Sequence, residues 1–156
     1  MPTRMISALF CSDLETIDPR WLSGDDSVMP PGKEVAEAIQ RQLTNSGGDS
    51  GPVYEYEDFA WEFYFKKDLR LMLVVQLAPP EPSRPLQFLL DVAIRIPLLH
   101  MFSPPARNFR VSKSFSAVTH AMNSLFGVTQ QGWFEKKPES NFGFLKQRLR
   151  KAFSRN

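Results

Sequence analysis

Three consecutive stretches in the middle of the chain alternate apolar with polar residues, a pattern typical of β-strands. They cover residues 59–65, 70–77 and 87–96. Successive side chains of a strand point to opposite faces of a sheet, so each stretch offers one apolar face to a core. The residues expected on that face are Phe59, Trp61, Phe63, Phe65, Leu71, Leu73, Val75, Leu77, Phe88, Leu90, Val92, Ile94 and Ile96. The pattern predicts three neighbouring antiparallel strands.

The connection between the first two stretches determines how they pair. A three-residue loop, 67–69, places Phe65 opposite Leu71 and keeps apolar residues opposite apolar residues beyond that pair. A two-residue loop would place Phe65 opposite Arg70 instead. Because a one-residue slip moves every side chain to the other face, the apolar match favours the three-residue loop.

The remaining segments add helices and further strands. Helices are expected over 33–44, 113–126 and 140–153, where apolar residues recur at intervals of three and four. Strands are expected over 5–15 and, at a sheet edge, over 130–138. The resulting order, β-α-β-β-β-α-(β)-α, predicts an α+β fold. We expect a single antiparallel sheet of about four to five strands with two to three helices packed on one face.

Proline and serine mark where two of the helices begin. Pro30–Pro31 precede the first helix, and proline is tolerated only in a first turn. The prolines within 97–105 indicate a break, so the second helix is expected to begin after them, with Ser112 as its cap. The chain has 156 residues, a length that suits one domain, and residues 1–156 are assigned to a single α+β domain.

Charge is unevenly distributed along the chain. Residues 1–62 hold twelve acids and four bases, giving −8, whereas residues 63–156 hold five acids and fifteen bases, giving +10. An asymmetry of this size either marks an electropositive face for an acidic partner or is neutralised when the two halves fold together.

Cysteine usage and hydropathy bear on the compartment. Cys11 ends an apolar strand, where a cysteine is usually a small buried hydrophobe, and as the one cysteine it forms no internal disulfide. The first fifteen residues lack the apolar core of a signal peptide. The longest uncharged apolar run, 96–102, is far shorter than a membrane span. We expect a cytoplasmic protein.

Recognisable catalytic motifs are missing from the sequence. It contains no phosphate-binding or dinucleotide-binding glycine loop, no G-x-S-x-G elbow, no H-E-x-x-H helix and no EF-hand loop. Of the two histidines, His120 lies off the apolar stripe of its helix and is expected at the surface. These features favour a non-enzymatic protein with no catalytic residue, metal or cofactor, although an enzyme stays open as an alternative.

The densest segment of the chain, YEYEDFAWEFYF over 54–65, combines seven aromatic residues with four carboxylates. It fits a solvated strand entrance followed by an aromatic core, an acidic–aromatic surface that binds a protein, or a catalytic or metal site. Tyrosine and tryptophan are favoured interface anchors. Glu55 and Glu57 share a face about 7 Å apart, a spacing that also suits paired carboxylates. The candidate partner-binding residues are Tyr54, Glu55, Tyr56, Glu57, Asp58, Glu62 and Tyr64.

The predicted C-terminal helix carries a basic face. Its simplest interpretation is a helix packed on the sheet with that face in solvent. A membrane-surface helix has the same pattern, and so does a nucleic-acid contact. The candidate basic-surface residues are Lys146, Arg148, Arg150 and Lys151.

The stretch EYEDFAWEFYF resembles an acidic–aromatic E-D-x-x-W-x-F strand of small bacterial proteins, some of which are encoded beside secreted toxins as immunity proteins. The resemblance covers about a dozen residues and a similar order of helices and strands. It implies that Trp61 lies in the sheet and that Glu57 and Asp58 lie at its edge. It also implies a cytoplasmic binder that blocks a toxin by stoichiometric contact, without turnover.

We therefore expect a non-catalytic protein-binding domain, in the form of an immunity or adaptor protein that neutralises or scaffolds a protein partner. One alternative is a small enzyme or ligand-binding protein with a pocket beside the aromatic strand. The other is a peripheral nucleic-acid or membrane-surface binder that acts through the basic C-terminal helix.

Overall fold

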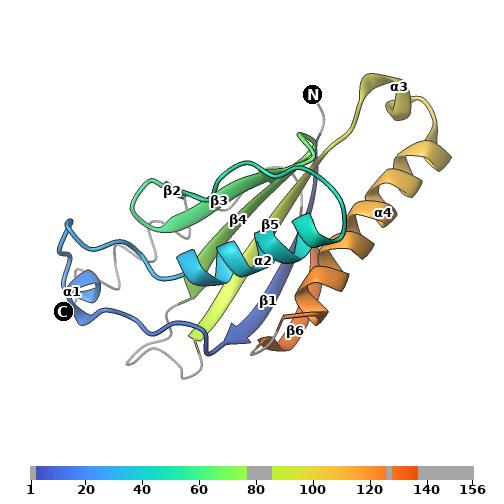
Figure 1. Ribbon diagram of the computed structural model, residues 1–156. Coiled ribbons are helices and arrows are strands. Elements are labelled where there is room, and N and C mark those ends of the chain that lie inside the picture. Colours follow the sequence, from blue (N-terminus) through green and yellow to red (C-terminus); the bar gives the residue numbers. More distant parts are fainter. Residues whose placement is uncertain (1–2, 77–85, 126–127, 137–156) are drawn as a thin grey trace.

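The computed structural model describes residues 3–76, 86–125 and 128–136, whose strands form one antiparallel sheet (Figure 1). The strands are β1 (Thr3–Ser12), β2 (Tyr54–Tyr56), β3 (Ala60–Phe65), β4 (Leu69–Gln76), β5 (Leu86–Arg95) and β6 (Val128–Lys136). The helices are α1 (Pro19–Leu22), α2 (Lys33–Asn45), α3 (Leu98–Met101) and α4 (Pro104–Asn123). The order across the sheet is β2-β3-β4-β5-β1-β6, so β1 is inserted between two strands from the second half of the chain.

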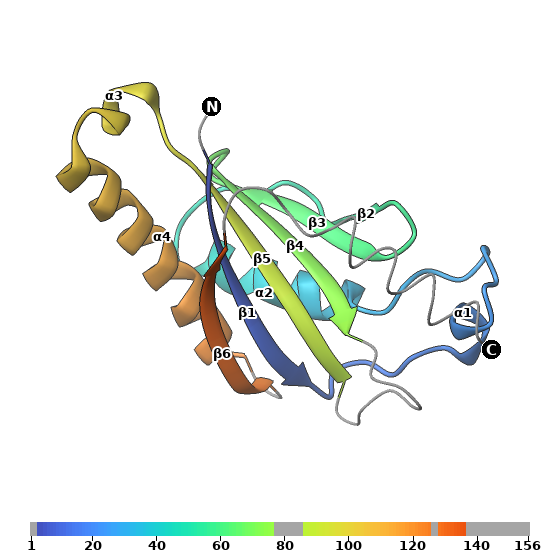
Figure 2. The same ribbon diagram turned by 180° about the vertical axis from the view of Figure 1, so that it is seen from behind.

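The α+β class and the single antiparallel sheet are confirmed. Helices α2 and α4 lie across one face of the sheet, and the view from behind shows the other face (Figure 2). The sheet has six strands where four to five were expected, and the described ranges contain four helices where two to three were expected. The additional elements are β2 and the single-turn helices α1 and α3, which change the element order. In the described ranges no helix combines the length and apolarity needed to cross a membrane.

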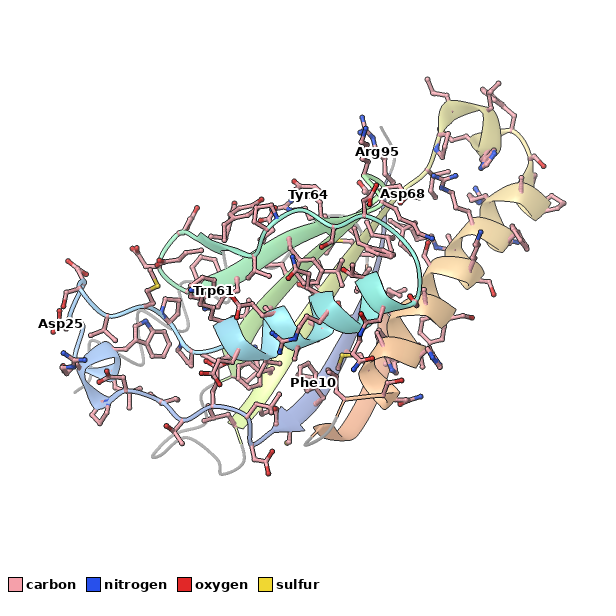
Figure 3. All side chains as sticks on the ribbon, in the orientation of Figure 1. Phe10, Asp25, Trp61, Tyr64, Asp68 and Arg95 are labelled. Carbon is pink, nitrogen blue, oxygen red and sulfur yellow. The ribbon has the colours of Figure 1, made fainter. Side chains whose placement is uncertain are left out.

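The hydrophobic core lies between the sheet and the two long helices. Phe10 and Trp61 lie between the sheet and α2 (Figure 3), and both are buried. The indole Nε1 of Trp61 donates to the Pro30 carbonyl at 2.9 Å, which satisfies its polar atom inside the core. Gly32 has φ 123°, and a Cβ there would lie 3.2 Å from Trp61 Cδ1. Glycine at this position lets the start of α2 approach the sheet closely.

The start of α2 is capped by a distant carboxylate, which sequence reasoning missed. Gly32 precedes the helix and has no side chain to accept from the first free backbone amides. Glu15 does so instead, accepting from Gly32 N at 3.0 Å and from Val35 N at 3.1 Å. Burial raises the pKa of Glu15, although the two amide donors act in the opposite direction. The predicted helix over 33–44 is otherwise confirmed.

The pairing predicted for the hairpin was wrong by two residues, although its odd loop is confirmed and Trp61, Phe63 and Phe65 do face the core. Phe65 pairs with Leu69, so the loop is 66–68 and not 67–69. This choice keeps Leu69 buried against the core and gives the turn to three polar residues. Lys66 and Lys67 adopt left-handed backbone angles, with φ of 52° and 61°, and allow the chain to reverse directly after Phe65.

The prediction that Phe59 faces the core was also wrong. Phe59 lies in the turn before β3, where strand alternation does not apply, and packs with Ala60, Met72 and Val74 on the opposite face.

The second predicted helix begins earlier than expected, and the assignment of Ser112 as its cap was wrong. Helix α4 begins at Pro104, and Ser103 Oγ accepts from Ala106 N at 3.4 Å as the N-cap. Pro104 and Pro105 occupy the first turn, where the missing amide hydrogens have no helical partner to lose. Ser112 lies inside the helix. The predicted edge strand is confirmed as β6, and the predicted helix over 140–153 lies outside the described residues.

Candidate functional site

The face of the sheet away from the helices brings together polar residues from β2, β3 and β4. Tyr54 pairs with Glu62 across β2 and β3, and Tyr64 pairs with Arg70 across β3 and β4. Directly opposed residues of an antiparallel pair point to the same face. These four residues alternate with the buried Trp61, Phe63 and Leu71 of the opposite face, so all four lie on one side of the sheet.

Glu62 is a buried carboxylate with a full set of partners. Its side chain is only 2% exposed. Arg70 donates to both oxygens, Nε to Oε1 at 2.8 Å and Nη2 to Oε2 at 3.0 Å. Tyr54 OH donates to Oε1 at 2.7 Å. Charge-assisted and bidentate bonds are the strong class of hydrogen bond, and they compensate the burial of the charge. The carboxylate of Glu62 is therefore occupied by the protein's own donors.

The same contacts hold Tyr54 and Arg70 in one protonation state. Burial raises the pKa of Tyr54 well above its usual 10, and the neighbouring Glu62 carboxylate adds to the shift. The hydrogen bond that Arg70 donates to Glu62 raises the pKa of Arg70. Tyr54 is thus a neutral donor and Arg70 a fixed cation throughout the physiological range.

An aromatic and cationic surface surrounds the buried glutamate. Tyr54 is 40% exposed, Tyr64 is 44% exposed, and the side chain of Arg70 is 39% exposed. The Arg70 guanidinium lies 5.5 Å from the ring centroid of Tyr56, which is partly buried on the same face. We call Tyr54, Tyr56, Tyr64 and Arg70 the tyrosine–arginine surface. It presents two exposed phenol rings beside a cation that Glu62 holds in place.

The structure separates the other predicted site residues from this surface. Glu55 lies opposite Trp61 and therefore on the other face of β2 from Tyr54 and Tyr56. Burial raises the pKa of Glu55, and the nearby Asp58 carboxylate adds a smaller effect. Glu57 and Asp58 lie in the exposed turn between β2 and β3, where Glu57 has φ 51°. The segment therefore divides into a clustered set and a dispersed set. The clustered set is Tyr54, Tyr56, Glu62 and Tyr64, and the dispersed set is Glu55, Glu57 and Asp58.

Sequence reasoning missed Arg70 because of the hairpin register. The predicted loop over 67–69 placed Tyr64 opposite Met72, whereas the observed pairing places Tyr64 opposite Arg70. The signal was available, since Arg70 has the opposite parity from Leu71 and therefore faces away from the core. The candidate basic residues at the C-terminus, Lys146, Arg148, Arg150 and Lys151, lie outside the described residues.

A second polar pair shares the face of Glu62 but does not form a catalytic set. Ser7 Oγ donates to Asp91 Oδ1, and both side chains are buried. Asp91 is separated from Glu62 by Met72 in the same row of paired residues, which spans two strand spacings or roughly 10 Å. His100 lies on α3, beyond the end of the sheet, and His120 lies on α4, which covers the other face (Figure 1). A Ser-His-Asp relay therefore has no histidine beside Ser7.

The predicted positions of Cys11 and His120 are confirmed. Cys11 is buried, and His120 is exposed on α4. Within the described ranges, no three histidine, cysteine, aspartate or glutamate residues gather in a way that could hold a metal ion. A scan against known protein families finds no match to this chain, and a search of curated proteins finds none either.

Proposed function

We propose that this chain is a non-catalytic protein-binding domain that contacts its partner through the tyrosine–arginine surface. The observation that carries the proposal is the placement of exposed Tyr54 and Tyr64 beside Arg70, which the buried Glu62 holds at both oxygens. Tyrosine and arginine are enriched among the residues that dominate binding energy at protein interfaces.

Preorganisation supports this proposal. A side chain that is already immobilised loses little conformational entropy when a partner covers it. The bidentate bond fixes the guanidinium of Arg70, and the bond to Glu62 fixes the phenol of Tyr54. Rigid tyrosines also supply a large contact area at low entropic cost. Moreover, β2 is an edge strand of the sheet formed by the described residues, and an edge strand can pair with a strand of a partner.

The finer form of the proposal is an immunity or adaptor protein of the cytoplasm. The acidic–aromatic strand suggests the immunity form, in which the chain blocks a toxin by one-to-one contact. Inhibition by contact needs no catalytic group, and Glu62 is already bonded to Arg70 and Tyr54. An adaptor would use the same surface but leave its partner active.

Site-specific crosslinking tests the proposal in cells. The photoreactive residue p-benzoylphenylalanine is placed at Tyr54 or Tyr64, and at Arg41 as a control on the exposed side of α2. A protein captured at both tyrosine positions and not at position 41 is purified, and its binding to the wild-type chain is measured by calorimetry. We expect a one-to-one complex, with Tyr64→Ala weakening it by about thirtyfold and Arg41→Ala leaving it unchanged. Capture at position 41 alone, or full affinity in Tyr64→Ala, contradicts the proposal.

A titration of the captured protein's own activity separates the two finer forms. An immunity protein abolishes that activity at one molar equivalent, and inhibition is lost in step with affinity in Tyr64→Ala. An adaptor binds with the same stoichiometry but leaves the activity intact. Loss of activity at far below one equivalent indicates turnover and contradicts a non-catalytic role.

A further inference from the structure

Helix α3 and the beginning of α4 project beyond the end of the sheet (Figures 1 and 2). We call residues 98–109 the apolar tip. None of residues 97–113 is buried, and the first buried side chain of α4 is Ser114. The tip is therefore not held by the core of its own domain, and α4 first packs against that core at Val111, two residues after the tip.

The tip exposes large apolar side chains to an unusual degree. The exposed fractions are 60% for Leu98, 85% for Leu99, 39% for Met101, 86% for Phe102 and 69% for Phe109. Single exposed apolar residues are ordinary, but a contiguous group on a soluble domain marks an interaction site. Prolines flank the part of this group that runs from Leu98 to Phe102, since Pro97 precedes α3 and Pro104 begins α4. It is thus a preformed apolar projection.

A basic collar surrounds this apolar projection. Residues 92–134 contain four bases and no aspartate or glutamate. One acid, Asp68 in the β3–β4 turn, lies beside Arg95 at the end of the sheet (Figure 3). The Oδ2 atom of Asp68 accepts from Arg110 Nη2 at 2.7 Å. The same turn contains two lysines, Lys66 and Lys67, so its net charge is positive. The four bases are Arg95, Arg107, Arg110 and Lys113.

Several polar nitrogens of the tip and its collar have unused hydrogen-bonding capacity. Arg107 Nε, Arg110 Nε and His100 Nδ1 are shielded from solvent and find no hydrogen-bond partner among the described residues. A shielded donor without a partner costs free energy, so an acceptor that reaches these groups would stabilise them. Because the arginine nitrogens are N–H donors on a cation, an anion such as a phosphate suits them.

We infer that the apolar tip docks on an anionic phospholipid membrane surface. Apolar side chains that enter the interface, flanked by arginine and lysine that contact anionic headgroups, are the combination by which peripheral proteins bind lipid. The tip is convex, so a protein partner would need a matching groove, whereas a fluid bilayer interface admits a projection without one. Nucleic acid offers phosphates but no apolar layer for Leu99 and Phe102.

Vesicle sedimentation with the full-length chain tests this inference. The probe is phosphatidylcholine vesicles with 30% phosphatidylserine, compared with phosphatidylcholine alone. We expect binding to the anionic vesicles that falls as salt is raised. The double variant Leu99→Ser/Phe102→Ser should lower the partition coefficient by about tenfold or more, because it removes two inserting side chains. Met29→Ser is the matched control, since Met29 is 57% exposed in the loop before α2 and should not contact lipid.

The charged collar has its own variant. Arg107→Gln/Lys113→Gln should weaken binding to anionic vesicles severalfold and flatten its salt dependence, while leaving the weak binding to neutral vesicles unchanged. All these positions are exposed or partly exposed, so an unchanged unfolding midpoint is expected and confirms that each variant is folded.

Four results would overturn the inference. They are no sedimentation with anionic vesicles at low salt, equal partitioning of wild type and Leu99→Ser/Phe102→Ser, equal binding to neutral and anionic vesicles, and loss of binding only on neutralising Lys146 and Arg150. The last result would assign lipid binding to the C-terminal residues. A soluble protein that binds the tip while vesicles do not would assign the tip to a protein interface instead.

Discussion

Glu62 shows how a single residue organises a surface that it does not itself expose. The carboxylate is buried, but its three hydrogen bonds set the positions of Arg70 and Tyr54, whose outer parts remain in solvent. A buried charge is tolerated only when it is paired, so Arg70 has a structural role beside its proposed role in binding.

Removing one partner of the Glu62–Arg70 pair should cost more than removing both. Arg70→Met leaves the buried carboxylate without its cation and should lower the free energy of unfolding by about 2–3 kcal/mol. This is less than the roughly 3–5 kcal/mol typical of a fully buried pair, because Arg70 is partly exposed. Glu62→Leu/Arg70→Met replaces both charges with apolar side chains and should cost about 1 kcal/mol or less. Urea unfolding of both single variants and the double variant measures the coupling.

The exposed Arg41→Met on α2 is the control for this cycle and should change the free energy of unfolding by no more than about 0.5 kcal/mol. A double variant that loses as much stability as the two single variants together would show that the pair is not coupled.

Glu15 makes stability depend on pH in a predictable direction. Burial raises its folded-state pKa above the ordinary 4.5. The folded protein therefore binds this proton more tightly than the unfolded chain. The resulting stabilisation is fully present below about pH 4.5 and is lost as pH rises through the raised pKa. Wild type should therefore lose stability relative to Glu15→Gln as pH rises from about 4.5 through the raised pKa.

Urea unfolding of both proteins across this pH window measures the difference. The comparison cancels the other titrating groups, because the two chains share them. If wild type instead gains stability over Glu15→Gln as pH rises, the amide bonds from Gly32 and Val35 outweigh burial, and the folded pKa of Glu15 is below 4.5.

At the scale of elements, α4 is one continuous helix with two different environments. Its second half packs on the core through Val118 and Met122, which are both fully buried. Its first half carries no buried residue before Ser114. Short helices are marginal in water without tertiary packing, so the first half should open independently.

Hydrogen exchange followed by mass spectrometry should resolve these two halves. We expect amides in 107–112 to exchange at least about tenfold faster than amides in 116–122. Anionic vesicles should slow exchange in 107–112 and leave 116–122 unchanged, because only the tip contacts lipid. Uniform protection along the helix in the free protein would contradict the division.

The elements that sequence reasoning placed correctly are those with a repeated pattern. Alternation assigned Trp61, Phe63 and Leu71 to the core face, and a register error of two residues leaves those faces unchanged. Periodicity placed α2 within one residue of its observed end. Patterns that recur over several residues therefore identify faces better than they identify pairing partners.

The features that sequence reasoning missed depend on a single residue or on distance. β2 reverses into β3 at Glu57, which adopts φ 51° without the glycine or asparagine that usually signals such a turn. Adjacent prolines occur both in the first turn of a helix and at a break between helices, so the sequence alone does not distinguish the two cases. For Pro104 and Pro105, only the packing of α4 decides between them. The contact between Glu15 and α2 joins residues seventeen and twenty positions apart, and no local pattern announces it.

At the scale of the whole molecule, folding mixes the two oppositely charged halves of the chain. The acidic first half supplies β1, which lies between β5 and β6 of the basic second half. The halves do not form separate faces. Charge nevertheless remains uneven, because residues 13–26 hold five acids and one base, and residues 92–125 hold four bases and no acid.

These two segments lie at opposite ends of the molecule. The acidic segment includes α1 and Asp25, at one end, and the basic segment includes α3, at the other (Figures 1 and 3). An anionic surface attracts the basic end and repels the acidic end, so the long-range field orients the protein before contact. Apolar insertion of the tip then fixes the same orientation.

The orientation can be measured with a fluorophore attached at either end. Leu99→Cys and Asp25→Cys are each built on Cys11→Ala, since Cys11 is the one native cysteine, and are labelled with an environment-sensitive dye. On anionic vesicles that contain nitroxide lipids, we expect the dye at position 99 to brighten without nitroxide and to be quenched with it. The dye at position 25 should stay in water, unquenched. Equal quenching at both positions would mean that charge does not orient the molecule, and quenching at position 25 alone would place the acidic end on the lipid.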